Sequence, residues 1–187
     1  MQIIKALQFV RENVEKTLYK ESLTDEHKSD IEKFQCNKHE DIVEFLTEKA
    51  LIYHYAGNSR TFLYYDEDDN LISFYSLFND HVTISKKSKE KYKWTLPNLD
   101  MYPAIRLHYF AVDSRYQKKK FGKYMMGEVF TTCARIAADS GCNFIVLQAK
   151  ENAIGFYKKL GFKSTGDPTK DGFQTMIFKL AYLEESS

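Results

Sequence analysis

A predicted buried strand, a short loop and a long amphipathic helix constrain the fold of this chain more than any other feature. Residues 105–112 have the pattern of a buried strand. Apolar residues then recur every three or four positions from Phe121 to Ile136, and Gly141 ends that helical pattern. A helix placed just after a strand directs its unpaired N–H groups beyond the carboxyl end of the strand, where they attract anions. The sequence therefore predicts an anion site between the strand and the helix.

The rest of the chain supplies further helices and strands on both sides of this unit. Helical periodicity predicts helices, and runs of aromatic and β-branched residues predict strands. Before the unit we predict helices over 1–20 and 41–55 and a β-hairpin of strands 61–65 and 71–78 around the acidic turn 66–70. After it we predict a strand over 144–147, a helix over 152–159 and a last strand over 175–180, while residues 79–103 form an irregular connection. This order predicts an α/β fold with a mixed sheet flanked by helices.

Composition narrows the class of protein. The chain has 187 residues, no internal repeat and no flexible linker, so we expect a single domain over 1–187. The net charge of +1 gives no overall attraction to nucleic acid or to a membrane surface, although residues 86–93 and 118–123 are locally basic. Three cysteines without a CxxC pair and five scattered histidines predict neither disulfides nor a metal site. With no leader and no membrane span, we expect a cytoplasmic protein.

The loop before the long helix carries the residues suited to an anion. It combines backbone donors, several lysines and one glycine, which lets the chain approach a ligand closely. Its members are Gln117, Lys118, Lys119, Lys120, Phe121, Gly122 and Lys123. A pyrophosphate would suit this loop. The alternative is that a lysine triplet before a helix is a solvated surface turn.

A second motif covers residues 151–162. Asn152 stands at a helix start, where it can cap the helix or hydrogen-bond a ligand, and Tyr157 follows about one and a half turns later. A phenol held beside a leaving group can act as a general acid. The alternative is that Phe156 and Tyr157 are core aromatics of a short helix.

Both motifs resemble those of the GNAT superfamily of acyl-CoA-dependent N-acetyltransferases. The loop resembles the family's Q/R-x-x-G-x-G/A pattern, with Gln117 first, Gly122 last and Lys120 in place of the middle glycine. Residues 151–162 resemble the block N-x-x-A-x-x-F-Y-x-x-x-G-F, whose F-Y and G-F pairs correspond to Phe156-Tyr157 and Gly161-Phe162. The resemblance covers about residues 34–180, which leaves 1–33 as an extra N-terminal helical segment.

The resemblance implies a fold, a co-substrate and a set of roles. The fold is a mainly antiparallel central sheet of about six or seven strands whose fourth and fifth strands splay apart. The enzyme would use acetyl-CoA as co-substrate, without a metal, and transfer the acetyl group directly to a primary amine. The general acid would be Tyr157, which protonates the departing CoA thiolate. The residues that bind acetyl-CoA would be Phe110, Ala111, Val112, Gln117, Lys118, Lys119, Lys120, Phe121, Gly122, Lys123 and Asn152.

The amine acceptor stays open at this point. The N-terminal half, including residues 34–37 and 74–77, looks like that of GNAT toxins from toxin–antitoxin pairs, which acetylate aminoacyl-tRNA. A charged tRNA and an antitoxin are therefore candidate partners beside a small-molecule or other macromolecular amine. A catalytically silent acyl-CoA-binding module is the rival from another class. The general base is open too, although Arg106 and His108 share one face of their strand. We expect a monomer or a homodimer.

Overall fold

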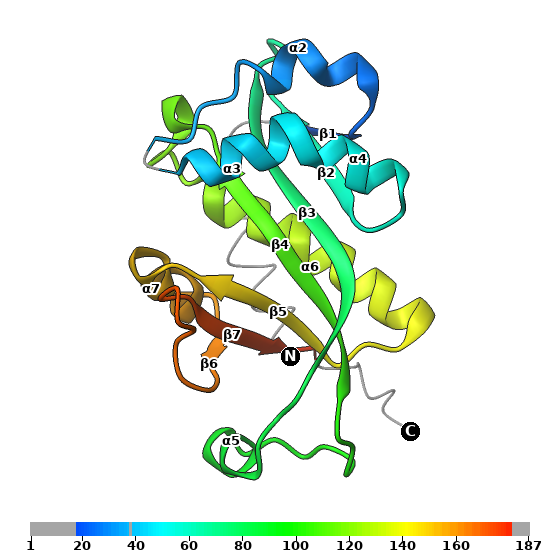
Figure 1. The fold of residues 1–187 in the computed structure, drawn as a ribbon, viewed down its shortest axis with the longest axis vertical. Coiled ribbons are helices and arrows are strands. Elements are labelled where there is room, and N and C mark those ends of the chain that lie inside the picture. Colours follow the sequence, from blue (N-terminus) through cyan, green and yellow to red (C-terminus); the bar gives the residue numbers. More distant parts are fainter. Residues whose placement is uncertain (1–17, 38, 181–187) are drawn as a thin grey trace. The chain divides into compact units, whose positions relative to one another are not determined.

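A computed structural model describes residues 18–37 and 39–180 of the chain. Their strands form one seven-stranded mixed sheet in the order β1-β2-β3-β4-β5-β7-β6 (Figure 1). Strands β4 and β5 run parallel, whereas β1–β2, β2–β3, β5–β7 and β6–β7 are antiparallel pairs. The predicted fold class, a mainly antiparallel mixed sheet flanked by helices, is confirmed.

The chain divides into two compact units, and two strands and one helix contribute to both. The N-terminal unit contains residues 18–37, 39–78 and 107–131, and the C-terminal unit contains residues 79–106 and 132–180. Within the N-terminal unit lie β1 (Tyr19–Ser22), η1 (Asp25–His27), α2 (Lys28–Ile31), α3 (Glu40–Glu44), η2 (Phe45–Lys49), α4 (Ala50–Tyr55), β2 (Arg60–Tyr65) and η3 (Ser114–Tyr116). Within the C-terminal unit lie α5 (Lys86–Tyr92), β5 (Phe144–Ala149), α7 (Glu151–Lys159), β6 (Lys163–Ser164) and β7 (Gln174–Lys179). Shared between the units are β3 (Leu71–Val82), β4 (Tyr102–Val112) and α6 (Phe121–Ser140).

Helices cover both faces of the strands in the N-terminal unit. Successive residues of a strand point to opposite faces. Leu63 of β2 packs in a core with Phe45 and Leu46 from the helical segment 40–55. Its neighbour Tyr64 points the other way, and its hydroxyl donates a hydrogen bond to Glu128 of α6 at 3.3 Å. Figure 1 shows α3 and α4 in front of these strands and α6 behind them.

The core of the C-terminal unit forms around the paired strands β4, β5 and β7. Ala104 to Arg106 of β4 pair with Phe144 to Val146 of β5, which pairs along its whole length with β7. Phe144 is fully buried between Tyr102 of β4 and the ring of Trp94. The segment after α5 thus belongs to this core.

Most of the predicted elements are present. The helix over 41–55 appears as α3, the π-helical turn η2 and α4, and the hairpin appears as β2 and β3. The strand–loop–helix unit appears as β4 and α6, and α6 ends before Gly141, which has a φ of 71°. The strands over 144–147 and 175–180 and the helix over 152–159 correspond to β5, β7 and α7.

Two predictions need correction. Residues 1–17 of the predicted helix over 1–20 lie outside the described residues. At its end, Tyr19 and Lys20 belong to the strand β1 and not to a helix. They pair with Tyr65 and Tyr64 of β2, and the Tyr19 and Tyr65 rings stack at 5.5 Å, so the sheet edge overrides the helical periodicity there. The connection 79–103 contains the helix α5, whose lysines hide its periodicity.

Two absences hold for the part of the chain that the structure describes. None of its helices is long and apolar enough to cross a membrane. Its histidines, cysteines and acidic residues form no group of three or more that would hold a metal ion.

Candidate functional site

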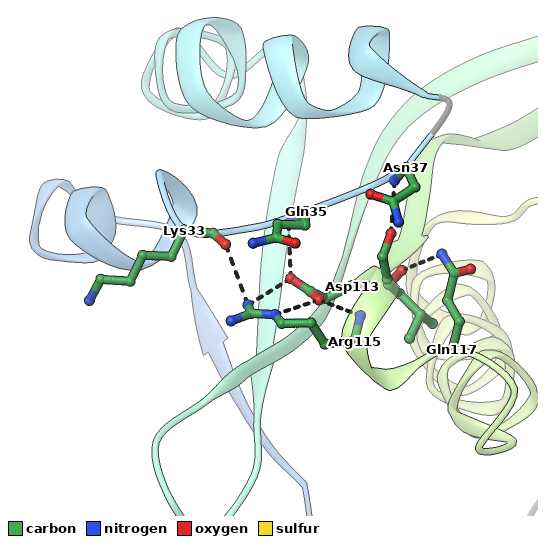
Figure 2. Close-up of polar contacts among 8 residues, drawn as sticks. Lys33, Gln35, Asn37, Asp113, Arg115 and Gln117 are labelled. Carbon is green, nitrogen blue, oxygen red and sulfur yellow. Dashed lines mark hydrogen bonds and ion pairs between the residues drawn. The ribbon is translucent and has the colours of Figure 1, made fainter.

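The end of β4 and the turn that follows it are held by one buried carboxylate. Asp113 is fully buried, and its backbone N–H donates to the carbonyl of Ile72 at 2.9 Å. Its side chain caps η3 by accepting from the N–H of Arg115 at 2.9 Å, and it also accepts from the Arg115 guanidinium at Nε (2.9 Å) and Nη2 (2.8 Å). Figure 2 shows these contacts converging on the carboxylate. The turn therefore leaves the strand in a fixed direction.

The charge of Asp113 is stabilised in place. Burial by itself raises the pKa of a carboxyl group, because it removes water from the charged form. The hydrogen bonds from Arg115 and from the backbone N–H groups of Gln35 and Arg115 outweigh that effect and hold the pKa of Asp113 below its ordinary value. Because Arg115 is half exposed, its guanidinium retains water while it neutralises the buried carboxylate.

A second segment braces the same turn from the side. Gln35 donates its N–H to Asp113 at 2.9 Å, and its carbonyl accepts from the N–H of Ser114 at 2.8 Å. The N–H of Asn37 donates to the Ser114 hydroxyl at 2.8 Å, as Figure 2 shows. Residues 33–37, Asp113, Ser114 and Arg115 thus form one hydrogen-bonded assembly, which we call the Asp113 clamp.

The loop after the clamp contains backbone conformations that side chains rarely adopt. Lys118 has a φ of 63° and Lys120 a φ of 68°, both in the left-handed region that favours glycine. The side chain of Gln117 donates to the carbonyl of Val112 at 3.0 Å and so ties the loop back to the end of β4 (Figure 2). Lys120 therefore does take the conformation that the middle glycine of the resembling pattern would take.

Positive charge and free donors meet at the start of α6. The carbonyl of Lys120 accepts from the N–H of Lys123 at 3.0 Å, so Lys120 occupies the capping position. The first N–H groups of a helix lack acceptors within the helix, and no acceptor from the described residues is recorded for Phe121 or Gly122. The positive end of the helix dipole adds to these donors.

The side chains of the loop extend this positive site. Lys118, Lys119 and Lys120 are exposed, and the Lys119 ammonium lies 5.3 Å from the centre of the Tyr116 ring. The Arg115 guanidinium approaches the same ring at 5.7 Å. Backbone donors, a helix N-terminus and several cations are the groups that bind a diphosphate. The predicted anion site thus has the donors its chemistry requires.

Tyr157 occupies the last turn of α7 in the C-terminal unit. Its carbonyl accepts from the N–H of Phe162 at 3.1 Å, and the carbonyl of Lys158 accepts from Gly161 at 3.1 Å. This pair of bonds is a Schellman motif, and Gly161 supplies its left-handed residue with a φ of 97°. The ring of Tyr157 packs against those of Phe156 and Phe162 at 5.2 and 5.6 Å. Backbone closure and ring packing together fix the phenol.

Burial keeps the phenol of Tyr157 in its neutral form. Burial raises the pKa of Tyr157 above its ordinary value, so the hydroxyl keeps its proton at neutral pH. No hydrogen bond to the hydroxyl is recorded from any described residue, which leaves its proton available to a ligand. Tyr157 is thus both a packed aromatic residue and a protonated donor.

Asn152 does not cap α7. The N-cap is Lys150, and no side chain accepts a hydrogen bond there. Asn152 lies inside the first turn with its side chain exposed, so of the two roles predicted for it, hydrogen bonding to a ligand is the one still open.

His108, the residue considered as a general base, and Arg106, which shares its strand, lie in different surroundings. Arg106 belongs to the C-terminal unit, where its Nε contacts Asp80 at 2.5 Å. His108 belongs to the N-terminal unit, where Phe45 and Phe78 each contact its ring edge to face at 5.1 Å. Arg106 is charged and ion-paired and has no lone pair to accept a proton, so of the two side chains only the His108 imidazole could act as a base.

The Asp113 clamp was not among the features predicted from the sequence. Its signal was available, because Asp113 directly follows a strand and precedes a short turn, where Asp typically bonds the backbone two residues on. The participation of Gln35 carried no local signal, since it lies far away in the sequence and meets Asp113 only after folding.

Comparisons with known proteins identify the family. Residues 20–162 match the model of the acetyltransferase (GNAT) family. The chain is 28% identical over 127 residues to a tRNA-acetylating toxin of Mycobacterium tuberculosis, an alignment that covers 67% of this chain and 74% of the toxin.

Two solved structures share the fold. AtaT in complex with acetyl-methionyl-tRNAfMet is 22% identical with a TM-score of 0.72, covering 87% of this chain and 95% of that one. A mutant of AtaT bound to the C-terminus of the antitoxin AtaR and acetyl-CoA is 20% identical with a TM-score of 0.69, covering 87% and 92%. The match of the family model over most of the chain shows that this protein belongs to the GNAT family of acetyltransferases.

Proposed function

We propose that this acetyltransferase transfers the acetyl group of acetyl-CoA to the α-amino group of an amino acid carried by tRNA. The observation that carries the proposal is the similarity to a tRNA-acetylating toxin over two thirds of the chain. The fold shared with AtaT, which was solved with an acetylated aminoacyl-tRNA, supports it. A small or protein amine as acceptor would use the same donor site.

The N-terminal unit would hold the acyl donor. The diphosphate of acetyl-CoA would contact the N–H groups of Phe121 and Gly122 and the lysines of the loop, where the helix dipole favours negative charge. The main chain of Phe110, Ala111 and Val112 would hydrogen-bond the pantetheine arm. The Asp113 clamp supports this assignment, because it fixes the exit of β4 and the loop together.

The C-terminal unit would supply the proton. As the neutral amine attacks the thioester carbonyl carbon, the carbon–sulfur bond breaks and the thiolate takes the proton of Tyr157. The proton lost by the amine passes to solvent, and the phenolate regains one from solvent. The phenol of Tyr157 is protonated at neutral pH and would give up its proton only as the sulfur develops charge. No covalent enzyme intermediate is needed.

Replacing Tyr157 tests the chemical step. Tyr157→Phe keeps the ring and its packing but removes the proton donor, so kcat should fall roughly 10²-fold while acetyl-CoA affinity stays nearly unchanged. The measurement is acetylation of aminoacyl-tRNA, followed by mass spectrometry of the aminoacyl end, beside calorimetric titration of acetyl-CoA. Unaltered turnover would remove the assigned role.

Replacing Gly122 tests the donor site independently. Gly122→Glu puts bulk and negative charge beside the diphosphate, so acetyl-CoA binding should be lost in calorimetry. The exposed substitution Lys170→Glu also introduces a negative charge, but outside the site, and this variant should bind acetyl-CoA normally. A wild-type protein that binds acetyl-CoA and acetylates only free amines would keep the donor site and exclude tRNA as the acceptor carrier.

A protein partner belongs to the same proposal. A relative in fold was solved with the C-terminus of an antitoxin bound. We therefore expect an antitoxin to hold this chain inactive, and growth arrest on expression of the chain alone, abolished by Tyr157→Phe, is the corresponding observation in cells.

A further inference from the structure

The connection between β3 and β4 carries a dense cluster of positive charge. Residues 86–93 contain five lysines and one glutamate, although the whole chain has a net charge of only +1. The helix α5 occupies Lys86–Tyr92 of this stretch, which we call the lysine arm. All its lysines are exposed except Lys89, which is half-buried beside the ring of Tyr102 at 5.2 Å.

The lysine arm is attached firmly to the C-terminal unit. The hydroxyl of Ser85 caps α5 by accepting from the N–H of Ser88 at 3.1 Å. At the other end, the hydroxyl of Tyr92 donates to the carbonyl of Ser164 at 2.6 Å, and the Trp94 ring packs on Phe144 at 5.5 Å. The arm therefore presents its lysines from a fixed base.

The charges of the arm are not neutralised within the described part of the chain. No ion pair joins any of its five lysines to a carboxylate of residues 18–37 or 39–180. Lys87 and Lys91 are four residues apart on α5, a spacing at which like charges destabilise a helix. A helix this short is marginal by itself. The fold thus holds together a cluster of lysines that repel one another. A bound polyanion would reduce this repulsion.

We propose that the lysine arm binds the phosphate backbone of the RNA that carries the acceptor amino acid. The inference rests on the proposed function, since it assigns an RNA contact to that reaction. Exposed ammonium groups act as point charges that displace the counterions of phosphates. The arm recognises charge and shape of the RNA and makes no base-specific contact.

The apolar residues of the arm argue against a membrane as its partner. A helix that lies on a membrane surface needs an exposed apolar face beside its cationic one. Tyr92 of the arm packs at 5.0 Å against Trp94, which follows the arm and packs on the core of the C-terminal unit. Only the cationic face of α5 remains for a partner, which suits phosphates in water.

The test is a titration of fluorescently labelled deacylated tRNA, followed by anisotropy over a range of salt concentrations. The full-length variant Lys86→Gln, Lys87→Gln, Lys91→Gln should bind roughly tenfold or more weakly near ~0.1 M salt. Its salt slope should be smaller by about one for each lysine that contacts a phosphate. The matched variant Lys28→Gln, Lys159→Gln, Lys170→Gln removes three exposed lysines elsewhere and should bind like the wild type.

The outcomes separate the arm from the proposed function. Unchanged affinity and slope in the arm variant, with a wild type that binds and acetylates charged tRNA, would overturn the arm and keep the function. If tRNA binding depends on the arm but charged tRNA is not acetylated, the RNA-binding role of the arm would stand and aminoacyl-tRNA would be rejected as the acceptor. Equal losses in both triple variants would show diffuse attraction and overturn the arm. The single variant Lys87→Gln, with a slope smaller by about one, replaces the triple variant if circular dichroism shows the latter unfolded.

Discussion

Two of the turns that place residues in the left-handed region do so by different means. The turn after α7 uses Gly161, with a φ of 97°, and two backbone hydrogen bonds of a Schellman motif. The loop before α6 uses Lys118 and Lys120, with φ values of 63° and 68°. A side chain in this region costs roughly 1–2 kcal/mol, which glycine avoids.

The difference lies in what enforces each conformation. At Gly161 the local sequence suffices, because glycine adopts the turn and the helix end supplies the carbonyls. At the lysine loop the conformation is imposed from outside, by the Asp113 clamp and by the bond from Gln117 to Val112. The first turn is locally encoded, whereas the second depends on residues 33–37 and 113–115 being in place.

The largest effect should follow from breaking the clamp. Asp113→Ala removes a buried carboxylate and leaves the N–H of Gln35 without its acceptor, at a cost of about 3 kcal/mol in the free energy of unfolding. Acetyl-CoA affinity should fall with it, since the loop loses its brace. Urea denaturation and calorimetry measure the two. The exposed control Asp68→Ala should change neither, and equal stability of Asp113→Ala would show that the clamp does not hold the loop.

A smaller loss is expected at the locally encoded turn. Gly161→Ala forces a side chain into a positive φ and places its Cβ 3.2 Å from the ring of Phe178. We expect a loss of about 2 kcal/mol, from backbone strain and the displaced ring. Gly155→Ala is the matched control, because no atom lies within 4 Å of that Cβ and alanine favours a helix. If Gly161→Ala were as stable as Gly155→Ala, the Schellman turn would not depend on glycine.

Relieving the strained loop should have an effect of opposite sign. Lys120→Gly removes the left-handed strain of about 1–2 kcal/mol but makes the unfolded chain more flexible, so the net gain should be about 0.5–1 kcal/mol. Thermal or urea unfolding measures it, with the exposed Lys119→Gly as comparison. A destabilised Lys120→Gly variant would mean that the lysine side chain stabilises the loop by its own contacts.

The smallest effect should appear as a dependence on pH. The pKa of Asp113 is lowered in the folded state, so its charge stabilises the fold above the ordinary carboxyl pKa of about 4. That contribution disappears as the pH falls through the lower folded pKa. Wild type should therefore lose more stability than Asp113→Asn between about pH 6 and pH 3.5. The other carboxylates contribute equally to both proteins, so their effect cancels in the difference between the two free energies of unfolding. Equal losses of stability in the two proteins would contradict a lowered pKa of Asp113.

Local patterns predicted much of the fold and one part of the site. The periodicity of 41–55 and 121–141 indicated helices, and the pattern of 105–112 indicated a central strand. Both patterns arise because a buried helix or strand places its apolar residues at the spacing of its own geometry. The motif around Tyr157 also predicted the helix and its glycine stop. The helix α5 was not predicted, because the lysine run 86–93 has no apolar residues at helical spacing.

By itself, the sequence determined the order of helices and strands, the cationic loop and the family, since these depend on spacing along the chain. Only the tertiary structure decided that Tyr19 and Lys20 extend a sheet, that Asp113 meets Gln35, and that Lys120 adopts the conformation of a glycine. Each of these depends on partners distant in sequence, whose hydrogen bonds and packing override local preference.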